Sequence, residues 1–271
     1  MRRAALLALA CCAGAPGVRA GDCLSEASLP PSAQQGALVI GTGVPGTVYE
    51  YLGHSSVVAD DGVIVFGLAR DAPERVELPL RCADGRRGTL ALDVARREYT
   101  IERIEGLPEK TVHPPPEIAE RIAREQAEVA KVRTRDDARS DFRMRFAWPV
   151  RARISGVYGS QRVLNGTPKD PHLGLDLAAP EGTPVHAPAA GVVTLAQKDY
   201  YLTGGTVILD HGHGVSSAFI HLSAVSVRPG QIVSQGDVLG AVGKTGRATG
   251  PHLHWGLNWF ETRLDPELLL K

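Results

Sequence analysis

The amino-acid sequence predicts a mainly β protein, with a small N-terminal β domain, one linker helix and a larger C-terminal β domain. The chain of 271 residues contains 30 glycines and 19 prolines, which favour turns and short strands over long helices. Short apolar or alternating runs recur before residue 110 and again after residue 146. Between these two regions, the apolar residues of one stretch follow a helical period.

Residues 1–20 have the pattern of a secretory signal peptide. Arg2 and Arg3 form a positive start, and the apolar run 4–10 that follows is too short to span a bilayer. Ala20 ends a small-x-small pattern that is typical of a cleavage site. A short N-terminal helix of a cytosolic protein is the alternative. We therefore expect a periplasmic or secreted protein, and no later apolar segment is long enough for a membrane helix.

Export would change the charge and the cysteine content of the chain. Removal of three arginines leaves 27 basic against 30 acidic residues, so the charge gives no indication of nucleic-acid binding. Cys11 and Cys12 would leave with the signal peptide, while Cys23 and Cys82 would remain and can form a disulfide in an exported chain. Lipidation at Cys11 is the alternative, although residues 8–10 match a lipoprotein cleavage site poorly.

Residues 21–110 are expected to form the small β domain, with the strand spacing of a sandwich. Clusters of Gly, Pro and Asp separate its apolar runs. The expected strands are 37–40, 57–59, 63–66, 76–78 and 89–92. This region contains no catalytic cluster, and we interpret His54 as a surface or turn residue rather than a ligand.

Residues 111–140 are expected to form a linker with one helix. Pro114-Pro115-Pro116 marks both the linker and a suitable start for a helix that runs from Glu117 to about Arg135. The apolar residues of this helix form one narrow stripe, made of Ile118, Ile122, Val129 and Val132. We expect the helix to pack along one of the β domains as a connector, and binding of a partner is the alternative.

Residues 141–271 are expected to form the second β domain, with strands at 191–194, 205–210, 215–221, 238–242 and 252–258. Two short segments of this domain carry side chains of the metal-ligand type. His172 and Asp176 are four residues apart, and His252 and His254 would point to the same face of a strand. Such residues, set among Gly, Pro and Leu, would be costly to bury without partners. Two imidazoles and a carboxylate that leave a fourth position open for water are the donor set of a catalytic zinc ion, so we predict a zinc peptidase.

The other histidines of this domain have simpler explanations on spacing alone. Glycines bracket the pair His211 and His213 between two apolar runs, which predicts a hairpin turn. His186 lies beside Pro and Ala at an expected strand edge and is not expected to be a ligand. His221 ends the run 218–220, where an imidazole beside a metal can transfer protons at neutral pH. A hydrogen-bonded structural histidine is the alternative for His221.

Four separated motifs occur in a fixed order over about residues 146–268. They are His172-x-Gly174-x-Asp176, Gly182-Thr183-Pro184-Val185, His221-Leu222, and Gly243-x-Thr245-Gly246 followed by Gly250-Pro251-His252-Leu253-His254. This order resembles the lysostaphin-type, or LytM-type, zinc endopeptidases. The resemblance implies an all-β domain built on a duplicated hybrid motif, which cleaves peptide cross-links of peptidoglycan. The N-terminal β domain and the helix lie outside the resemblance.

The resemblance also implies a role for each matching residue. His172, Asp176 and His254 would bind Zn²⁺, and His221 and His252 would be the catalytic pair. A metal-bound water would attack the scissile carbonyl, with one histidine taking its proton and both stabilising the charge on the oxygen. Some members of the family have a tyrosine shortly before the first ligand that helps to hold this oxygen. Residues 164–167 occupy that region here, which leaves the role without a residue.

The sequence therefore predicts an exported zinc metalloendopeptidase that acts on the stem peptides of peptidoglycan. We expect the D-alanyl-diaminopimelate bond to be cleaved, with glycine bridges as the alternative. A second hypothesis is a non-enzymatic activator of cell-wall amidases, because related domains that have lost their ligands act in this way. Two further hypotheses are that the N-terminal domain binds the cell wall, and that this domain and the helix cover the groove until they are displaced.

Overall fold

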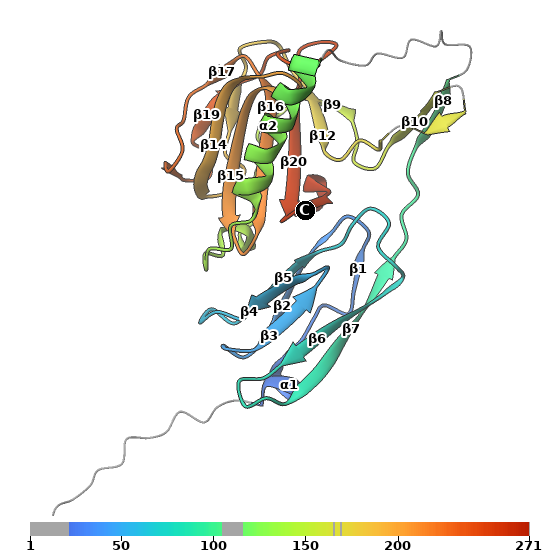
Figure 1. Ribbon diagram of the computed structural model, residues 1–271, viewed down its shortest axis with the longest axis vertical. Helices are drawn as coiled ribbons and strands as arrows, with labels where there is room; N and C mark the ends of the chain where they lie inside the picture. Colours follow the sequence, from blue (N-terminus) through green and yellow to red (C-terminus); the bar gives the residue numbers. More distant parts are fainter. Residues whose placement is uncertain (1–21, 105–115, 165, 169, 271) are drawn as a thin grey trace, which may run out of the picture.

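Two bodies of β structure make up the protein, and the helix α2 (Pro116–Arg133) lies along the larger one (Figure 1). The computed structural model describes residues 22–104, 116–164, 166–168 and 170–270. The expected signal peptide at 1–20 lies outside the described residues. Residues 111–115 of the expected linker also lie outside them. The structure confirms a mainly β protein with one long helix.

The N-terminal body contains two sheets. The five-stranded sheet has the order β1-β7-β6-β3-β4, and β2 pairs with β5 in a second sheet. The side chains of β6 alternate between exposed and buried, which places Val76, Leu78 and Leu80 in the core. The strands are β1 (Ser32–Gln34), β2 (Leu38–Thr42), β3 (Val48–Tyr51), β4 (His54–Val57), β5 (Val63–Gly67), β6 (Arg75–Arg81) and β7 (Arg87–Ala95).

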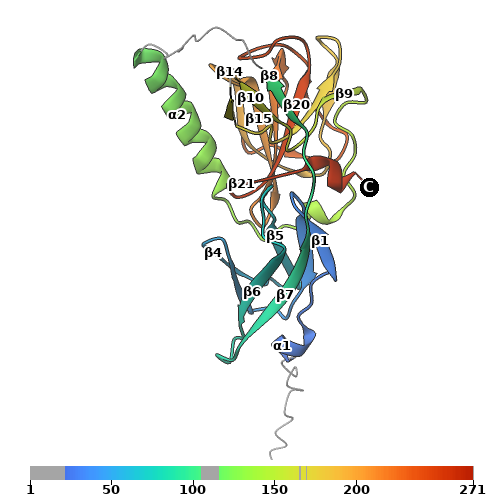
Figure 2. The same cartoon turned by 90° about the vertical axis from the view of Figure 1, so that its right-hand side faces the viewer.

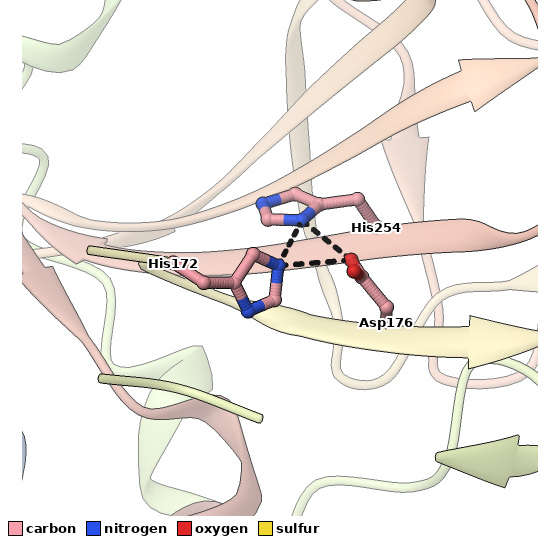
Figure 3. Close-up of side chains that lie close together, drawn as sticks. All are labelled: His172, Asp176 and His254. Carbon is pink, nitrogen blue, oxygen red and sulfur yellow. Dashed lines mark hydrogen bonds and ion pairs between the residues drawn. The ribbon is translucent and has the colours of Figure 1, made fainter. Parts of the chain in front are cut away.

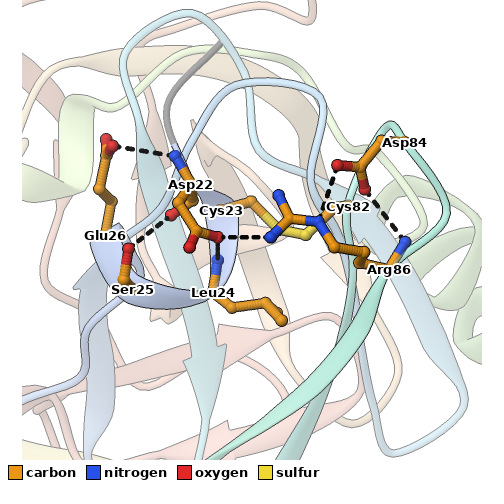
Figure 4. The surroundings of a disulfide bond; sticks show 8 residues. All are labelled: Asp22, Cys23, Leu24, Ser25, Glu26, Cys82, Asp84 and Arg86. Carbon is orange, nitrogen blue, oxygen red and sulfur yellow. Dashed lines mark hydrogen bonds and ion pairs between the residues drawn. A yellow bond between two sulfur atoms is a disulfide. The ribbon is translucent and has the colours of Figure 1, made fainter.

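A disulfide joins the short helix α1 (Cys23–Glu26) to the end of β6, as the sequence predicts for Cys23 and Cys82 (Figure 4). Polar contacts surround it. Asp22 caps α1 by accepting a hydrogen bond from the backbone N–H of Leu24, at 3.2 Å. Arg86 forms ion pairs with Asp22 at 2.9 Å and with Asp84 at 2.8 Å. The start of the described chain is therefore fixed to the N-terminal body.

The C-terminal body is built on a large sheet with the order β18-β14-β15-β16-β20-β12-β9, and β21 pairs with β20 at one side. A smaller sheet has the order β13-β19-β17. Most residues of β15 and β16 are buried because both of their faces are covered. The strands of the large sheet are β9 (Arg153–Gly156), β12 (Leu175–Ala178), β14 (Gly191–Tyr200), β15 (Gly204–Gly212), β16 (Val215–Leu222), β18 (Ile232–Val233), β20 (Leu253–Trp259) and β21 (Thr262–Leu264). The smaller sheet contains β13 (Pro184–His186), β17 (Ala224–Val225) and β19 (Val238–Ala241), and single turns of 3₁₀ helix lie at Asp141–Arg143 and Pro266–Leu269.

The helix α2 packs on one face of the large sheet, as Figures 1 and 2 show. Val129 and Val132 contact a cluster that Leu195, Tyr200, Ile208 and Ala218 form on the strands beneath. Ala218 and Ile220 are two residues apart on β16 and therefore point to the same face of the sheet. Ile220 pairs with His254 of β20. The face under α2 is therefore the face that carries His254. The helix therefore packs along the C-terminal body.

The strand β8 (Ile101–Ile104) leaves the N-terminal body and joins a separate three-stranded sheet. It pairs in parallel with β10 (Gln161–Leu164), which forms a hairpin with β11 (Thr167–Pro168). The strand that follows the N-terminal body thus borders the segment that leads to His172.

The two bodies also contact each other directly through His54. The ring of His54 stacks on Phe260 with a centroid distance of 3.9 Å, and its Nε2 lies 2.9 Å from Oε2 of Glu261. His54 begins β4 directly after the turn at 52–53, with 28% of its side-chain surface exposed, so it is partly a surface residue, as interpreted, and it also packs against the C-terminal body. A partner 207 residues away gives no local pattern in the sequence.

Candidate metal centre and active site

Three donor atoms converge where β12 and β20 lie side by side (Figure 3). His172 precedes β12, while Asp176 of β12 pairs with His254 of β20, so that the last two side chains share a face. Nε2 of His172 lies 3.0 Å from Oδ1 of Asp176 and 3.0 Å from Nδ1 of His254. Nδ1 of His254 lies 2.8 Å from Oδ1 of Asp176. Within the ranges that the structure describes, these residues form the one group of three or more ligand-type side chains.

The spacing of these atoms fits a single zinc ion. Ligand atoms about 2.0–2.1 Å from zinc are about 3.3 Å apart in a tetrahedral site, close to the separations here. Nδ1 of His172 donates a hydrogen bond to the carbonyl oxygen of Val157, at 3.0 Å. A ring whose Nδ1 carries the proton has its lone pair on Nε2, the atom that faces the other two residues.

The electrostatics keep Asp176 and His254 in the forms that bind metal. Burial acts to raise the pKa of Asp176, but the hydrogen bonds and charges of His172 and His254 outweigh it and hold the pKa well below its usual value. Burial lowers the pKa of His254, against the opposing effect of Asp176. A carboxylate and a neutral imidazole are the species that coordinate zinc.

Two further imidazoles, those of His221 and His252, lie beside this centre. Their ring centroids are 4.8 Å apart, and Nε2 of His252 lies 3.9 Å from Oδ1 of Asp176. Nδ1 of His221 donates to the carbonyl oxygen of Thr245 and Nδ1 of His252 to that of Gly250, both at 2.9 Å. In the neutral form of each ring, this leaves the lone pair on Nε2, where the ring can accept a proton.

His221 has an uncommon backbone conformation and a lowered pKa. Its φ is 66°, a left-handed conformation that is uncommon for a residue with a side chain. Its backbone N–H donates to the carbonyl oxygen of Thr203, at 2.8 Å. Burial lowers the pKa of His221 to about 4, so that the ring is neutral at pH 7. Strained residues of this kind are concentrated at functional sites.

The other H-x-H pair is structural, as the predicted hairpin requires. Nδ1 of His211 donates to the carbonyl oxygen of Ala190 at 2.7 Å, and its Nε2 accepts from the hydroxyl of Ser217 at 2.8 Å. His213 lies in the turn between β15 and β16, with a φ of 47°. His186 is also away from the centre, since its Nδ1 lies 2.9 Å from the carbonyl oxygen of Gly236.

A cavity of about 530 Å³ lies between α2 and the sheet and reaches the centre, because His254 is one of its lining residues. Leu173 and Ile220 line it from the sheet side, and Arg133 and Arg263 contribute two guanidinium groups. No sequence pattern singles out these arginines. They are 130 residues apart, and neither lies in a recognisable motif.

Among the described residues, Tyr158 does not fill the tyrosine role that the sequence left open. Tyr158 is the tyrosine that precedes His172 most closely in the sequence. Its hydroxyl donates to the carbonyl oxygen of Arg263 at 2.9 Å, and its side chain is buried. Asn165 of the segment 164–167 lies outside the described residues.

Comparisons with known proteins find similarity to peptidases of family M23. The sequence profile of Peptidase family M23 matches residues 170–266. Peptidoglycan DD-endopeptidase ShyA of Vibrio cholerae is 42% identical over 106 residues, which are 39% of this chain and 24% of that protein. DD-carboxypeptidase/endopeptidase Mpg of Neisseria meningitidis is 51% identical over 85 residues, which are 31% of this chain and 19% of that protein. The chain thus spans about a quarter or less of the length of these curated relatives.

A solved structure resembles the chain over much more of its length. It is a protein of Pseudomonas aeruginosa that is assigned to peptidase M23, with 33% sequence identity and a TM-score of 0.68. The alignment covers 89% of this chain and 95% of that one. The likeness therefore extends beyond the C-terminal body.

Proposed function

This chain belongs to peptidase family M23, and we propose that it is an exported zinc metalloendopeptidase that hydrolyses peptide cross-links of bacterial peptidoglycan. The observation that carries the proposal is the convergence of Nε2 of His172, Oδ1 of Asp176 and Nδ1 of His254 within 3.0 Å of one another. The descriptions of ShyA and Mpg as a DD-endopeptidase and a DD-carboxypeptidase/endopeptidase support the substrate class. We expect the D-alanyl-diaminopimelate bond to be cleaved.

His172, Asp176 and His254 would hold the zinc ion. When bound, the ion supplies Lewis acidity toward a water molecule and the scissile carbonyl. His221 and His252 are the candidates for proton transfer, because each has an Nε2 free to accept a proton. One ring takes the proton of the attacking water at Nε2 and later gives it to the leaving amine. The imidazolium formed in this way stabilises the negative charge on the substrate oxygen.

Fixed side chains make this chemistry efficient. The carbonyl oxygens of Thr245 and Gly250 hold the two catalytic rings, so little reorganisation accompanies the reaction. His221 is neutral at pH 7, so its ring has a lone pair available for a proton.

Export is supported by the pattern of residues 1–20 and by the disulfide between Cys23 and Cys82, since such bonds persist in oxidising compartments. Within the described ranges, no helix combines the length and apolarity that crossing a bilayer requires. The periplasm or the cell exterior is the compartment that fits the proposed substrate.

The test uses isolated murein sacculi and the mature chain, residues 21–271. We expect release of soluble muropeptides with zinc, no release with a chelator, and recovery when zinc is restored. Mass spectrometry of the products identifies the bond, and free D-alanyl carboxyl ends are expected rather than cut glycine bridges. Stoichiometric zinc would also argue against a non-enzymatic amidase activator, which needs no metal. If the zinc-loaded chain released nothing from cross-linked sacculi, the proposed activity would be wrong.

A further inference from the structure

The cavity under α2 brings two cationic side chains to the same space as the candidate metal centre. Arg133 lies in the last turn of α2, and Arg263 lies on β21. Both line the cavity of about 530 Å³ that His254 also lines. Its remaining walls are largely apolar, with Leu173, Ile220 and Val129 among them. The cavity is thus a continuation of the site rather than a separate pocket.

Neither guanidinium group has a carboxylate partner among the residues that the structure describes. Nε of Arg133 is buried there without a hydrogen-bond partner. Arg263 makes a long contact of 3.5 Å to the amide oxygen of Asn258. Glu261 lines the same cavity, but its Oε2 lies 2.9 Å from Nε2 of His54. Glu125, the other acid that lines the cavity, pairs with Arg121 at 2.7 Å. Both acids of the lining therefore have other partners.

The positive charges of Arg133 and Arg263 are costly to keep together in a partly buried cavity. Burial, and to a smaller degree the charge of Arg263, lowers the pKa of Arg133 to about 9, although the charge of Glu261 acts in the opposite direction. Burial also lowers the pKa of Arg263. An anion that enters the cavity removes part of this cost and can accept two parallel hydrogen bonds from a planar guanidinium group. The arrangement therefore favours a carboxylate ligand.

The register of the strands sets the distance from this ligand to the metal centre. Arg263 pairs with Asn258, which lies four residues from His254 along β20 and on the same face. At about 3.3 Å per residue, the two positions on β20 are about 13 Å apart. A long side chain at residue 263 reaches back over part of this span. A carboxylate held there belongs to a part of the substrate a short distance from the scissile bond.

We propose that Arg133 and Arg263 form a carboxylate-binding subsite, which recognises a free carboxylate of the stem peptide while the scissile bond lies at the metal centre. The subsite makes α2 a part of the substrate site as well as a connector. This inference rests on the proposed peptidoglycan endopeptidase activity, which it deepens by naming the group that the enzyme selects.

The test compares two cross-linked muropeptide dimers, one with free stem carboxylates and one with these carboxylates converted to primary amides. For the zinc-loaded wild type, we expect a KM about 10- to 100-fold lower for the free form, the range for hydrogen bonds to a charged group. Arg133→Gln and Arg263→Gln should remove most of this difference through KM, with little change in kcat. Lys131→Gln is the matched control, because Lys131 is exposed in the same turn of α2 and carries the same charge. The control should keep the preference.

A second measurement separates this inference from the activity. Calorimetry with the metal-free protein and a stem tetrapeptide, free or amidated, reports the subsite without hydrolysis. Arg133→Lys keeps the charge and should recover part of the preference if a glutamine variant folds poorly. Equal binding and equal KM for both forms in the wild type would overturn the subsite while leaving the endopeptidase intact. Failure to cleave either dimer, together with preferential binding of the free peptide, would instead overturn the activity and leave the subsite.

Discussion

Gly174 lies directly against the imidazole of His254. A Cβ atom at residue 174 would lie 2.5 Å from Nε2 and 2.6 Å from Cε1 of that ring. Such distances do not occur for real Cβ atoms, so a side chain here would force the ring or the backbone to move. The opposite nitrogen of the ring, Nδ1, lies 2.8 Å from Asp176. The missing side chain at residue 174 therefore helps to position a candidate ligand.

We predict that Gly174→Ala weakens zinc binding about 10- to 100-fold, the usual effect of disturbing the groups that orient metal ligands. Competition with a chromophoric chelator would measure the dissociation constant. Gly250→Ala is the matched control, since a Cβ there would meet nothing within 4 Å. Equal zinc affinity in both variants would contradict the argument.

We predict that Asp176→Asn loses zinc while the protein stays folded. The substitution keeps the shape of the side chain but removes the charge that the two imidazoles stabilise. Metal analysis after dialysis should find far less than one zinc per chain, and hydrolysis of sacculi should fall about 1,000-fold or more. Asp60→Asn, at an exposed position of the N-terminal body, should change neither quantity.

We predict that His221→Ala keeps its zinc and loses turnover. His221 is absent from the ligand triangle, and general acid–base catalysis contributes about 100- to 10,000-fold. Measurements of zinc content and of muropeptide release on the same sample would separate the two roles. Loss of zinc from this variant would show that His221 acts as a ligand instead.

Stability should decrease on acidification because His211 is buried in its neutral form. Burial lowers its pKa from 6.5 to about 4. Between these values the unfolded chain binds a proton that the folded chain does not, so the free energy of unfolding falls as the pH falls through this window. The limit of this contribution is about 3 kcal/mol, at 1.36 kcal/mol per pKa unit. Urea unfolding at pH 7 and pH 5 should show a larger loss for the wild type than for His211→Asn, and identical losses would refute this origin.

We predict that replacing both cysteines by serine lowers the free energy of unfolding by about 4 kcal/mol, because the disulfide closes a loop with a sequence separation of 59. Urea unfolding of the double variant would measure the loss. Zinc content should be unchanged, since Cys23 and Cys82 lie in the N-terminal body and the candidate centre lies in the other one. A loss of zinc would reveal a long-range effect that the contacts do not explain.

Patterns within short segments allowed much of the structure to be predicted. The pair His252 and His254 shares a face because β-strands repeat every two residues, and Leu253 between them is fully buried. Strand ends were harder to predict. The strand expected at 191–194 continues to Tyr200, because β15 pairs with Gln197 and again with Tyr200 across an irregularity at the exposed residues Lys198 and Asp199. Polar side chains at those positions hide the strand from a hydrophobic pattern.

Contacts between distant segments could not be predicted in the same way. Arg133 and Arg263 meet in one cavity only because α2 folds back over the sheet. His54 finds its partners, Phe260 and Glu261, at the far end of the chain. No local spacing encodes either relationship, since each depends on how the two bodies and the helix pack.

The parallel ladder between β8 and β10 has a mechanical consequence. Residues 101–104, which leave the N-terminal body, are bonded to residues 161–164, and the first candidate ligand follows only eight positions later. A load that pulled the bodies apart would shear this ladder along its length. Tension would then act on the backbone that precedes His172. Pulling the two bodies apart would therefore also displace a ligand of the candidate metal centre.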